Sequence, residues 1–363
     1  MPWTGATPEA TAAYAARLEG RVAPGSFRRA FGVTLSSLGI GTYLGRADEA
    51  GDRAYREALV AAFEGGVNVV DTAVNYRHQR SERAIGAALG DLADRGFPRP
   101  QVVVATKGGY VPSAAPERYF EEQIVKAGLA LAEDLAAGCH SIAPGYLRHQ
   151  LDTSLANLGL SAVDVYYLHN PEQQLDEVSP AVFSGRMRSA FEALEGAVSE
   201  GKVGVYGTAT WNGYRVPPDA GGALSLPALV ALAREVAGDG HHFRVVQLPF
   251  NLAMPEALTR ATQVTAAGPA SLLEAASALG VAVMTSASIF QGRLVRDLPA
   301  SVKEALPGLT TDVQRAIQFA RSAPGVTTAL VGMGRAEHVR DNVSVLGQPP
   351  LPEGAFLAAF SRR

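Results

Sequence analysis

Four side chains that could move a proton stand at or near the ends of three successive apolar runs. Asp71 closes the first run, Lys107 and His169 directly follow the next two, and Tyr76 comes five residues after Asp71. Taken singly, each has an ordinary structural explanation; Asp71, for example, could cap a turn or a helix. These residues, however, occupy equivalent positions of consecutive strands. Four unrelated structural explanations are improbable together. The spacing therefore predicts one site that combines a carboxylate, an ammonium, an imidazole and a phenol.

The three runs belong to a series of short segments rich in Val, Leu, Ile or Tyr, which is typical of strands buried on both faces of a parallel sheet. We expect eight such strands, at residues 37–42, 67–71, 101–106, 162–168, 203–208, 243–249, 281–286 and 327–331. Helical segments follow them, at residues 50–64, 82–92, 145–158, 186–199, 226–236, 270–279, 311–321 and 335–345. Eight strand–helix units predict an α/β fold, a closed (β/α)₈ TIM barrel, with its active site at the carboxyl ends of the strands.

A doubly wound open sheet is the alternative architecture. Its dinucleotide-binding turn requires the spacing Gly-x-Gly-x-x-Gly, and residues 39–45 have one residue too many before the last glycine. The closed barrel is therefore the fold that we expect.

The chain is expected to form a single barrel domain, residues 27–363, after an N-terminal extension, residues 1–26. Residues 8–18 of the extension have helical character. Residues 28–33 are suited to a short hairpin arm that plugs the bottom of the barrel.

Two connections are longer than a plain strand-to-helix loop. Residues 108–143 follow the third strand and include a helix expected at 116–135, and residues 209–224 follow the fifth strand. Loops at this end of a barrel surround the active site, and long ones often cover the substrate. Both connections are therefore candidate lids.

The 363-residue chain carries 32 Lys and Arg against 35 Asp and Glu, which gives a formal net charge of −3. This balance predicts no nucleic-acid partner and no membrane partner, and no stretch reaches the ~18 apolar residues that span a bilayer. The first twenty residues lack the apolar core of a signal peptide, and the single cysteine, Cys139, rules out an internal disulfide framework. A cytoplasmic protein is expected. Cys139 and His140 alone are too few ligands for a metal site, so no metal is expected.

Several segments resemble motifs of the aldo-keto reductases, and they occur in that family's order. Residues 66–76, which contain Asp71 and Tyr76, resemble the second-strand signature. Residues 106–107 resemble the family's lysine motif, and residues 164–171 resemble its histidine motif. Residues 201–207 resemble the entry to its fifth strand, and residues 331–342 resemble its closing cofactor segment. The resemblance extends from about residue 28 to 345. It implies the (β/α)₈ barrel, a nicotinamide cofactor extended across the rim, and a catalytic tetrad formed by Asp71, Tyr76, Lys107 and His169.

The implied activity is an oxidoreductase that transfers hydride between nicotinamide and a carbonyl or alcohol. The alkoxide that develops at a reduced carbonyl needs a proton, and a free phenol has a pKa of about 10. An ammonium within about 4–6 Å favours the phenolate, so we expect Lys107 to lower the pKa of Tyr76. Asp71 would hold Lys107 charged, and His169 would hydrogen-bond the substrate oxygen. Tyr76 would then be the general acid in reduction and the base in oxidation.

The same resemblance implies a set of cofactor-binding residues: Asp71, Thr42, Thr210, Gln247, Ser286, Gly332, Arg335, His338, Asp341 and Asn342. Two positions depart from the family. Ala209 stands where a hydrogen-bonding side chain is usual, and Ser286 stands where an aromatic ring often stacks on the nicotinamide. Arg335, together with His338 or Arg340, could bind a 2′-phosphate at a helix N-terminus, so NADP(H) is the preferred cofactor and NAD(H) the alternative.

The residues expected to face the substrate are Tyr43, Arg77, Tyr110, Asn170 and Trp211. Arg77 could bind a carboxylate or sugar hydroxyls. The expected partner is a small-molecule carbonyl or sugar substrate, and the oligomeric state is unknown. Two other functions fit the same residues: a nucleotide-sensing barrel without catalysis, and a redox-neutral epimerase or dehydratase that uses a bound cofactor.

Overall fold

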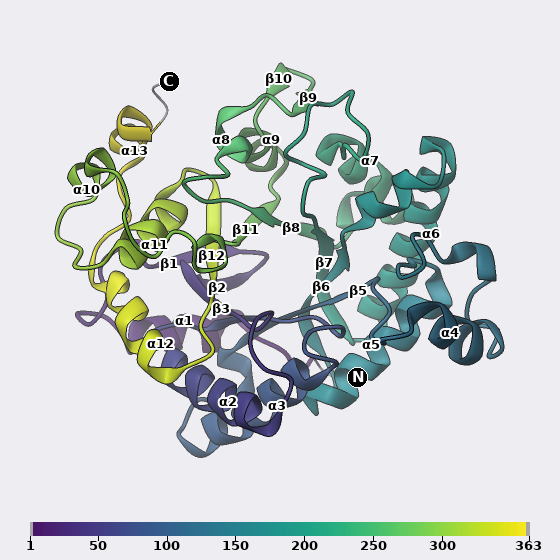
Figure 1. The fold of residues 1–363 in the computed structure, drawn as a ribbon, viewed down its shortest axis with the longest axis horizontal. Coiled ribbons are helices and arrows are strands. Elements are labelled where there is room, and N and C mark those ends of the chain that lie inside the picture. The colour runs from purple at the N-terminus through teal and green to yellow at the C-terminus, as the bar shows by residue number, and fades with distance from the viewer. Residues whose placement is uncertain (1–2, 361–363) are drawn as a thin grey trace.

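Eight parallel strands close into a barrel in the computed structural model, which describes residues 3–360 (Figure 1). Around the barrel the strands follow one another in chain order, and β12 closes the ring against β3. They are β3 (Leu38–Gly41), β4 (Val69–Asp71), β5 (Val103–Gly108), β6 (Val163–His169), β7 (Val203–Ala209), β8 (Phe243–Pro249), β11 (Ala282–Ser286) and β12 (Val326–Gly332). The predicted (β/α)₈ barrel is confirmed, and each strand lies within two residues of its predicted position.

Helices surround the barrel on its outside (Figure 1). The eight that follow the strands are α2 (Glu49–Glu64), α3 (Arg80–Asp94), α5 (Pro144–Leu158), α6 (Pro180–Ser199), α7 (Leu226–Ala237), α9 (Leu272–Leu279), α11 (Asp312–Ser322) and α12 (Ala336–Val343). Their starts are set by local chemistry, since Asp48, Ser179, Ser225, Ser271 and Thr311 accept hydrogen bonds from first-turn amides. Within residues 3–360, no helix is both long and apolar enough to cross a membrane.

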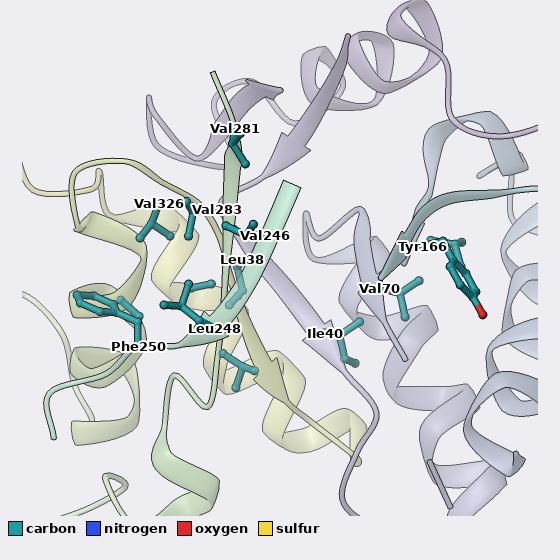
Figure 2. Close-up of a cluster of buried hydrophobic side chains, with 14 of the residues drawn as sticks. Leu38, Ile40, Val70, Tyr166, Val246, Leu248, Phe250, Val281, Val283 and Val326 are labelled. Carbon is teal, nitrogen blue, oxygen red and sulfur yellow. The ribbon is translucent and has the colours of Figure 1, made fainter. Parts of the chain in front are cut away.

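Successive side chains of each strand point alternately outward and inward, so the strands contribute to two separate apolar layers. Val70 and Tyr166 belong to the large cluster between the strands and the helices (Figure 2), whereas Val69 and Tyr167 belong to the cluster inside the barrel. Because side chains two residues apart on a strand share a face, Asp71 must point inward above Val69. The same rule turns Lys107 and His169 toward the axis at the carboxyl end of the barrel.

An antiparallel hairpin closes the opposite end of the barrel. It consists of β1 (Phe27–Ala30) and β2 (Val33–Ser36), and Val33 and Leu35 of β2 join the inner apolar cluster. The expected plug is therefore present. Helix α1 (Pro8–Ala16) packs beside it, and its Tyr14 hydroxyl donates to the Phe63 carbonyl over 2.6 Å. Residues 3–26 thus contribute buried side chains to the barrel floor.

The connection after β5 differs from its prediction. In place of one helix at 116–135, the structure has a short α4 (Pro116–Tyr119), a π-helical turn η2 (Phe120–Val125) and a 3₁₀ turn η3 (Ala132–Asp134). The predicted helix is wrong because the chain reverses at Gly128, which has a φ of 69°. Phe120 and Ile124 bury themselves against Tyr146 of α5 and form a small separate core.

The remaining elements are short. The 3₁₀ turns are η1 (Arg99–Gln101), η4 (Pro171–Asp176), η5 (Gly238–Gly240), η6 (Phe290–Gly292) and η7 (Ser344–Gly347). The additional helices are α8 (Glu256–Thr259), α10 (Ala300–Ala305) and α13 (Glu353–Phe360). A second small hairpin pairs β9 (Gln263–Thr265) with β10 (Gly268–Ala270).

Candidate active site

A buried ion pair lies at the base of the predicted site. The Lys107 Nζ donates to Asp71 Oδ2 over 2.6 Å and to the Thr72 carbonyl over 2.8 Å. Only 1% of the Lys107 side chain and 7% of the Asp71 side chain are exposed. The second Asp71 oxygen accepts from Gln247 Nε2 over 2.7 Å. Both carboxylate oxygens are therefore bonded, and this pair is fixed in one orientation.

Tyr76 lies directly over this pair. The Lys107 Nζ is 4.9 Å from the centroid of the Tyr76 ring, and the centroids of the Tyr76 and His169 rings are 5.7 Å apart. The ring of Tyr43 packs edge-on against Tyr76 at 5.0 Å. The structure thus brings together all four side chains that the sequence singled out.

The pKa of Tyr76 moves in the direction opposite to our expectation. Burial raises the pKa of this phenol well above 10, and the nearby charge of Asp71 raises it further. The expected lowering by Lys107 is absent, because the ammonium lies at the ring face and its charge is opposed by the contacting Asp71 carboxylate. Burial also lowers the pKa of Lys107, and the Asp71 charge acts against that shift. Tyr76 is accordingly a protonated phenol at neutral pH.

His169 is held as a neutral imidazole. Burial lowers its pKa well below 6.5, and the Lys107 charge adds to this effect. Its Nδ1 has no hydrogen-bond partner among the described residues. Its ring packs against Tyr110, with centroids 4.9 Å apart. This Nδ1 is buried, so the ring nitrogen left to exchange a hydrogen bond with a substrate oxygen is Nε2.

His140 supports His169 from below. Its Nε2 lies 2.7 Å from the His169 carbonyl oxygen, and its Nδ1 lies 2.8 Å from Gln174 Nε2. These partners require a proton on Nε2 and a lone pair on Nδ1, so the imidazole is neutral. Burial lowers the pKa of His140 to about 4. Both ring nitrogens are used within the fold, and no group of three or more potential metal ligands occurs among residues 3–360.

A cavity of about 650 Å³ opens above the four side chains at the mouth of the barrel. Twelve of the predicted site residues line it: Thr42, Tyr43, Asp71, Tyr76, Tyr110, His169, Asn170, Thr210, Trp211, Gln247, Ser286 and Gly332. Tyr43 and Trp211 are 56% and 39% exposed, so their rings border the cavity where it meets solvent. Of the segment 108–143, Tyr110 alone is among the lining residues that the structure describes.

Two cofactor candidates are already engaged in bonds within the barrel. The hydroxyl of Thr42 donates to the Asp71 carbonyl over 3.1 Å, and Gln247 donates to the Asp71 carboxylate. Thr42 is buried and borders the cavity. Both residues therefore restrain Asp71 whatever else they contact.

The closing segment lies beyond the cavity lining. Arg335 is exposed and lies 3.5 Å from Glu337, and His338 lies 3.9 Å from the same carboxylate. Asp341 is exposed and Asn342 is buried at the end of α12. These four predicted cofactor residues do not line the cavity; they follow Gly332, the lining residue nearest the C-terminus, within ten residues of the chain.

The structure places Arg77 away from the cavity. Its guanidinium is buried and donates to the Asp52 carboxylate over 2.6 Å and to the Arg46 carbonyl over 2.6 and 2.8 Å. Arg77, His78 and Gln79 all have left-handed backbones, with φ of 49°, 54° and 69°. This conformation costs non-glycine residues roughly 1–2 kcal/mol each. Arg77 is not a substrate ligand in this structure because its Nε and Nη2 hold that turn, and its Nη1, which has no partner among the described residues, is buried.

A buried carboxylate that the sequence did not single out stands three residues after His169. Glu172 Oε1 accepts from the backbone amides of Trp211, Asn212 and Gly213 over 2.7, 3.2 and 3.3 Å. Three converging amides fix the loop that presents Trp211 to the cavity. Its position three residues after a rim histidine was the available signal.

Part of the cavity wall was also not predictable from the sequence. Residues 287–292 follow β11, and Ala287, Ser288, Ile289, Gln291 and Gly292 line the cavity. Ala287 and Gln291 have left-handed backbones, each with a φ of 53°. Non-glycine residues in this conformation give no signal in sequence patterns.

The fold and the site together define a (β/α)₈ barrel with an Asp–Lys pair beneath a tyrosine and a histidine at its mouth. The chain belongs to the aldo/keto reductase family: the sequence model described as "Aldo/keto reductase family" matches residues 37–297. The resemblance noted in the motifs is therefore confirmed.

Two curated relatives share part of the chain. It is 32% identical over 149 residues to a D-threo-aldose 1-dehydrogenase of a Pseudomonas species, a match that covers 41% of each chain. It is 29% identical over 185 residues to the NADH-specific methylglyoxal reductase of Escherichia coli K12, which covers 49% of each. The chain thus spans less than half the length of these relatives in the matched regions.

Solved structures resemble the chain over almost its full length. An aldo-keto reductase from Bacillus halodurans in its holo form has a TM-score of 0.62 at 19% identity, covering 92% of this chain and 96% of its own. An aldo/keto reductase from Klebsiella pneumoniae in complex with NADP and acetate also has a TM-score of 0.62 at 19% identity, covering 94% and 97%. At this identity the likeness shows the fold.

The neutral state of His140 predicts a loss of stability in acid. The unfolded imidazole takes up a proton as pH falls through 6.5, whereas the folded one resists until about pH 4. Stability is therefore present above pH 6.5 and is lost as pH falls toward 4. Between pH ~7 and ~5 the His140 contribution is about 2 kcal/mol. Urea unfolding at both pH values should show a smaller acid loss in His140→Gln, whose amide can keep both hydrogen bonds. His149→Gln, a change at a partly exposed histidine, is the control; equal losses in both variants would contradict the prediction.

Proposed function

We propose that the protein is an NAD(P)(H)-dependent oxidoreductase that transfers hydride between nicotinamide and a carbonyl or alcohol. The observation that carries this proposal is the buried Asp71–Lys107 pair beneath Tyr76, with His169 beside it at the floor of a cavity. Such a set supplies a phenolic proton and a hydrogen-bonding imidazole at one point. The membership of the aldo/keto reductase family supports the same conclusion.

The cavity suits a flat, extended cofactor. At its mouth β3 and β12 end in Gly41 and Gly332, and a side chain added at Gly332 would meet nothing within 4 Å. A planar ring can therefore lie against bare backbone close to Tyr76. Thr210, Gln247 and Ser286 would hold the carboxamide end, and the ring edges of Tyr43 and Trp211 would border it. When bound, the nicotinamide supplies or accepts the hydride.

In reduction, Tyr76 donates its proton to the oxygen of the carbonyl as that oxygen gains negative charge. Its raised pKa keeps the phenol protonated at neutral pH, which suits this direction. His169 donates or accepts a hydrogen bond at the same oxygen. Lys107 stabilises the phenolate left behind, and Asp71 holds Lys107 in place. In oxidation Tyr76 accepts the proton, so oxidation should gain rate as pH rises.

Removing the phenolic hydroxyl tests this assignment. Tyr76→Phe should lower kcat by about 10²–10⁴, since a positioned acid contributes that much. Cofactor affinity should change little, because the ring remains. Stopped-flow turnover of an aldehyde panel gives kcat, and quenching of Trp211 fluorescence gives cofactor affinity; Trp3, the other tryptophan, lies at the opposite end of the barrel.

Three outcomes would contradict the proposal. Comparable turnover in Tyr76→Phe would remove Tyr76 as the proton donor. Tight cofactor binding by the wild type without hydride exchange would favour the nucleotide-sensing barrel. Substrate consumption with unchanged NAD(P)H would favour the redox-neutral epimerase or dehydratase.

We assign NADP(H) as the preferred cofactor through Arg335, which precedes α12. Its guanidinium is exposed, and Glu337 is its only charged contact within 4 Å among the described residues. A 2′-phosphate carries more charge than Glu337 and would displace it. Arg335→Ala should weaken NADPH binding about tenfold and leave NADH binding unchanged, as measured by the Trp211 titration. Arg260→Ala, which removes an exposed arginine directly after α8 and outside the closing segment, is the control. Equal weakening of both cofactors would overturn the assignment.

The charges around the cavity favour an uncharged substrate. Among the lining residues that the structure describes there is no lysine or arginine. Lys107 is paired with Asp71, His169 is neutral, and Arg77 is committed elsewhere. A carboxylate beside the reacting carbonyl would lose its water without gaining a cation, which costs several kcal/mol.

A matched pair of substrates tests this preference. A 2-oxo acid should be reduced with a kcat/KM at least about tenfold lower than that of its amide, because only the acid brings a charge into the cavity. The ratio is corrected for intrinsic reactivity by the rates of borohydride reduction of the two compounds. An acid that is reduced faster than its amide after this correction would refute the preference.

A further inference from the structure

The turn that follows Tyr76 is held by contacts unrelated to substrate. Only 2% of the Arg77 side chain is exposed, and its guanidinium contacts Asp52 of α2 and the carbonyl of Arg46. The guanidinium carbon also lies 5.0 Å from the centroid of the Tyr55 ring. Arg80 reaches the other oxygen of Asp52 over 2.6 Å, so that one carboxylate anchors both ends of the turn.

The same contacts reach the loop that carries Tyr43. The carbonyl of Arg46 belongs to the connection between β3 and α2, and the Tyr55 hydroxyl donates to the Leu44 carbonyl in that connection. Tyr43 packs against Tyr76 at 5.0 Å. The guanidinium therefore joins the two segments whose aromatic rings meet at the cavity.

The backbone around the guanidinium leaves space for it. A Cβ at Gly51 would lie 2.7 Å from the Arg77 Nη2 and would clash with the Arg46 carbonyl. Arg77 itself has a φ of 49°, a conformation that glycine adopts without cost. A long side chain thus occupies a strained backbone position next to a glycine that leaves room for its guanidinium.

We propose that Arg77 is a positioning residue for Tyr76: its guanidinium, anchored on Asp52 and the Arg46 carbonyl, holds the left-handed turn 77–79 and so fixes the phenol above Lys107 and beside His169. Tyr76 is the residue immediately before the turn. Release of the turn moves the Tyr76 backbone directly, whereas the Asp71–Lys107 pair lies on the strands and stays in place. The catalytic part of this statement rests on the proposed function; the mechanical part does not.

The chain offers a matched control pair. Asp91 of α3 binds Arg56 of α2 through two hydrogen bonds, so it joins α2 and α3 by an Arg–carboxylate pair remote from Tyr76. Asp52→Ala and Asp91→Ala therefore remove the same chemistry from different places. A general loosening of the α2–α3 contact would follow from either change, but loss of the turn follows only from the first.

Hydrogen exchange measured by mass spectrometry on the full-length protein tests the mechanical part. Asp52→Ala should speed amide exchange at least about tenfold in residues 43–48 and 76–81, since the anchor joins both segments. Asp91→Ala should leave these segments at the wild-type rate. Unchanged exchange in Asp52→Ala, or equal acceleration in both variants, would overturn the proposal. This measurement needs no substrate, so it stands if the proposed function fails.

Turnover tests the catalytic part. Arg77→Met should lower kcat at least about tenfold while cofactor affinity by Trp211 fluorescence stays within about threefold. Arg77→Lys, which keeps a charge toward Asp52, should recover part of the loss, and so should guanidinium ion added to Arg77→Met. A kcat that is unchanged in a folded Arg77→Met protein would overturn the positioning role. Absence of turnover in the wild type would instead count against the proposed function alone.

Discussion

The buried contact between Asp71 and Lys107 is the constraint on which the rest of the site depends. An ammonium that is 1% exposed is stable only beside a carboxylate, and removing one partner of such a pair typically costs about 3–5 kcal/mol. The barrel meets this need by ending adjacent strands in the two residues and by adding Gln247 and Thr42 as further restraints on Asp71. Tyr76 and His169 are then placed against a charge arrangement that cannot rotate away.

This arrangement also explains why the phenol remains protonated. A lone ammonium below Tyr76 would favour the phenolate, but a paired ammonium presents little net charge to the ring. Burial then dominates and raises the pKa of Tyr76. The same burial keeps His169 and His140 neutral, so that the cavity floor holds few free charges. Proton donation in such a site draws on a weak acid that stays undissociated at neutral pH and gives up its proton only to an oxygen that is gaining negative charge.

The sequence predicted the parts of the molecule that follow from local periodicity. Eight apolar runs, each followed by a helical segment, indicated the barrel, and the positions of Asp71, Lys107 and His169 at strand ends indicated one shared site. The position of Arg77 was not predictable, because Arg77 lies in a turn and its partner Asp52 lies on helix α2, 25 residues earlier in the chain. The pKa shift of Tyr76 could not be inferred from the presence of Lys107 alone. The direction of that shift depends on where the ammonium lies relative to the ring and on what else contacts the ammonium. The wall at 287–292 escaped notice because its left-handed residues are not glycines.

The insertion after β5 is joined at its base. Val111 donates to the Cys139 carbonyl and Ser141 donates to the Gly109 carbonyl, so the segment leaves and re-enters the barrel rim through a short antiparallel pairing. The residues between these bonds form their own small core on α5. Such a segment can gain, lose or exchange residues during evolution without disturbing His169, since chain length beyond a closed base adds little entropic cost. The rim therefore combines a reaction floor fixed by the strands with an attachment point whose length the barrel does not constrain.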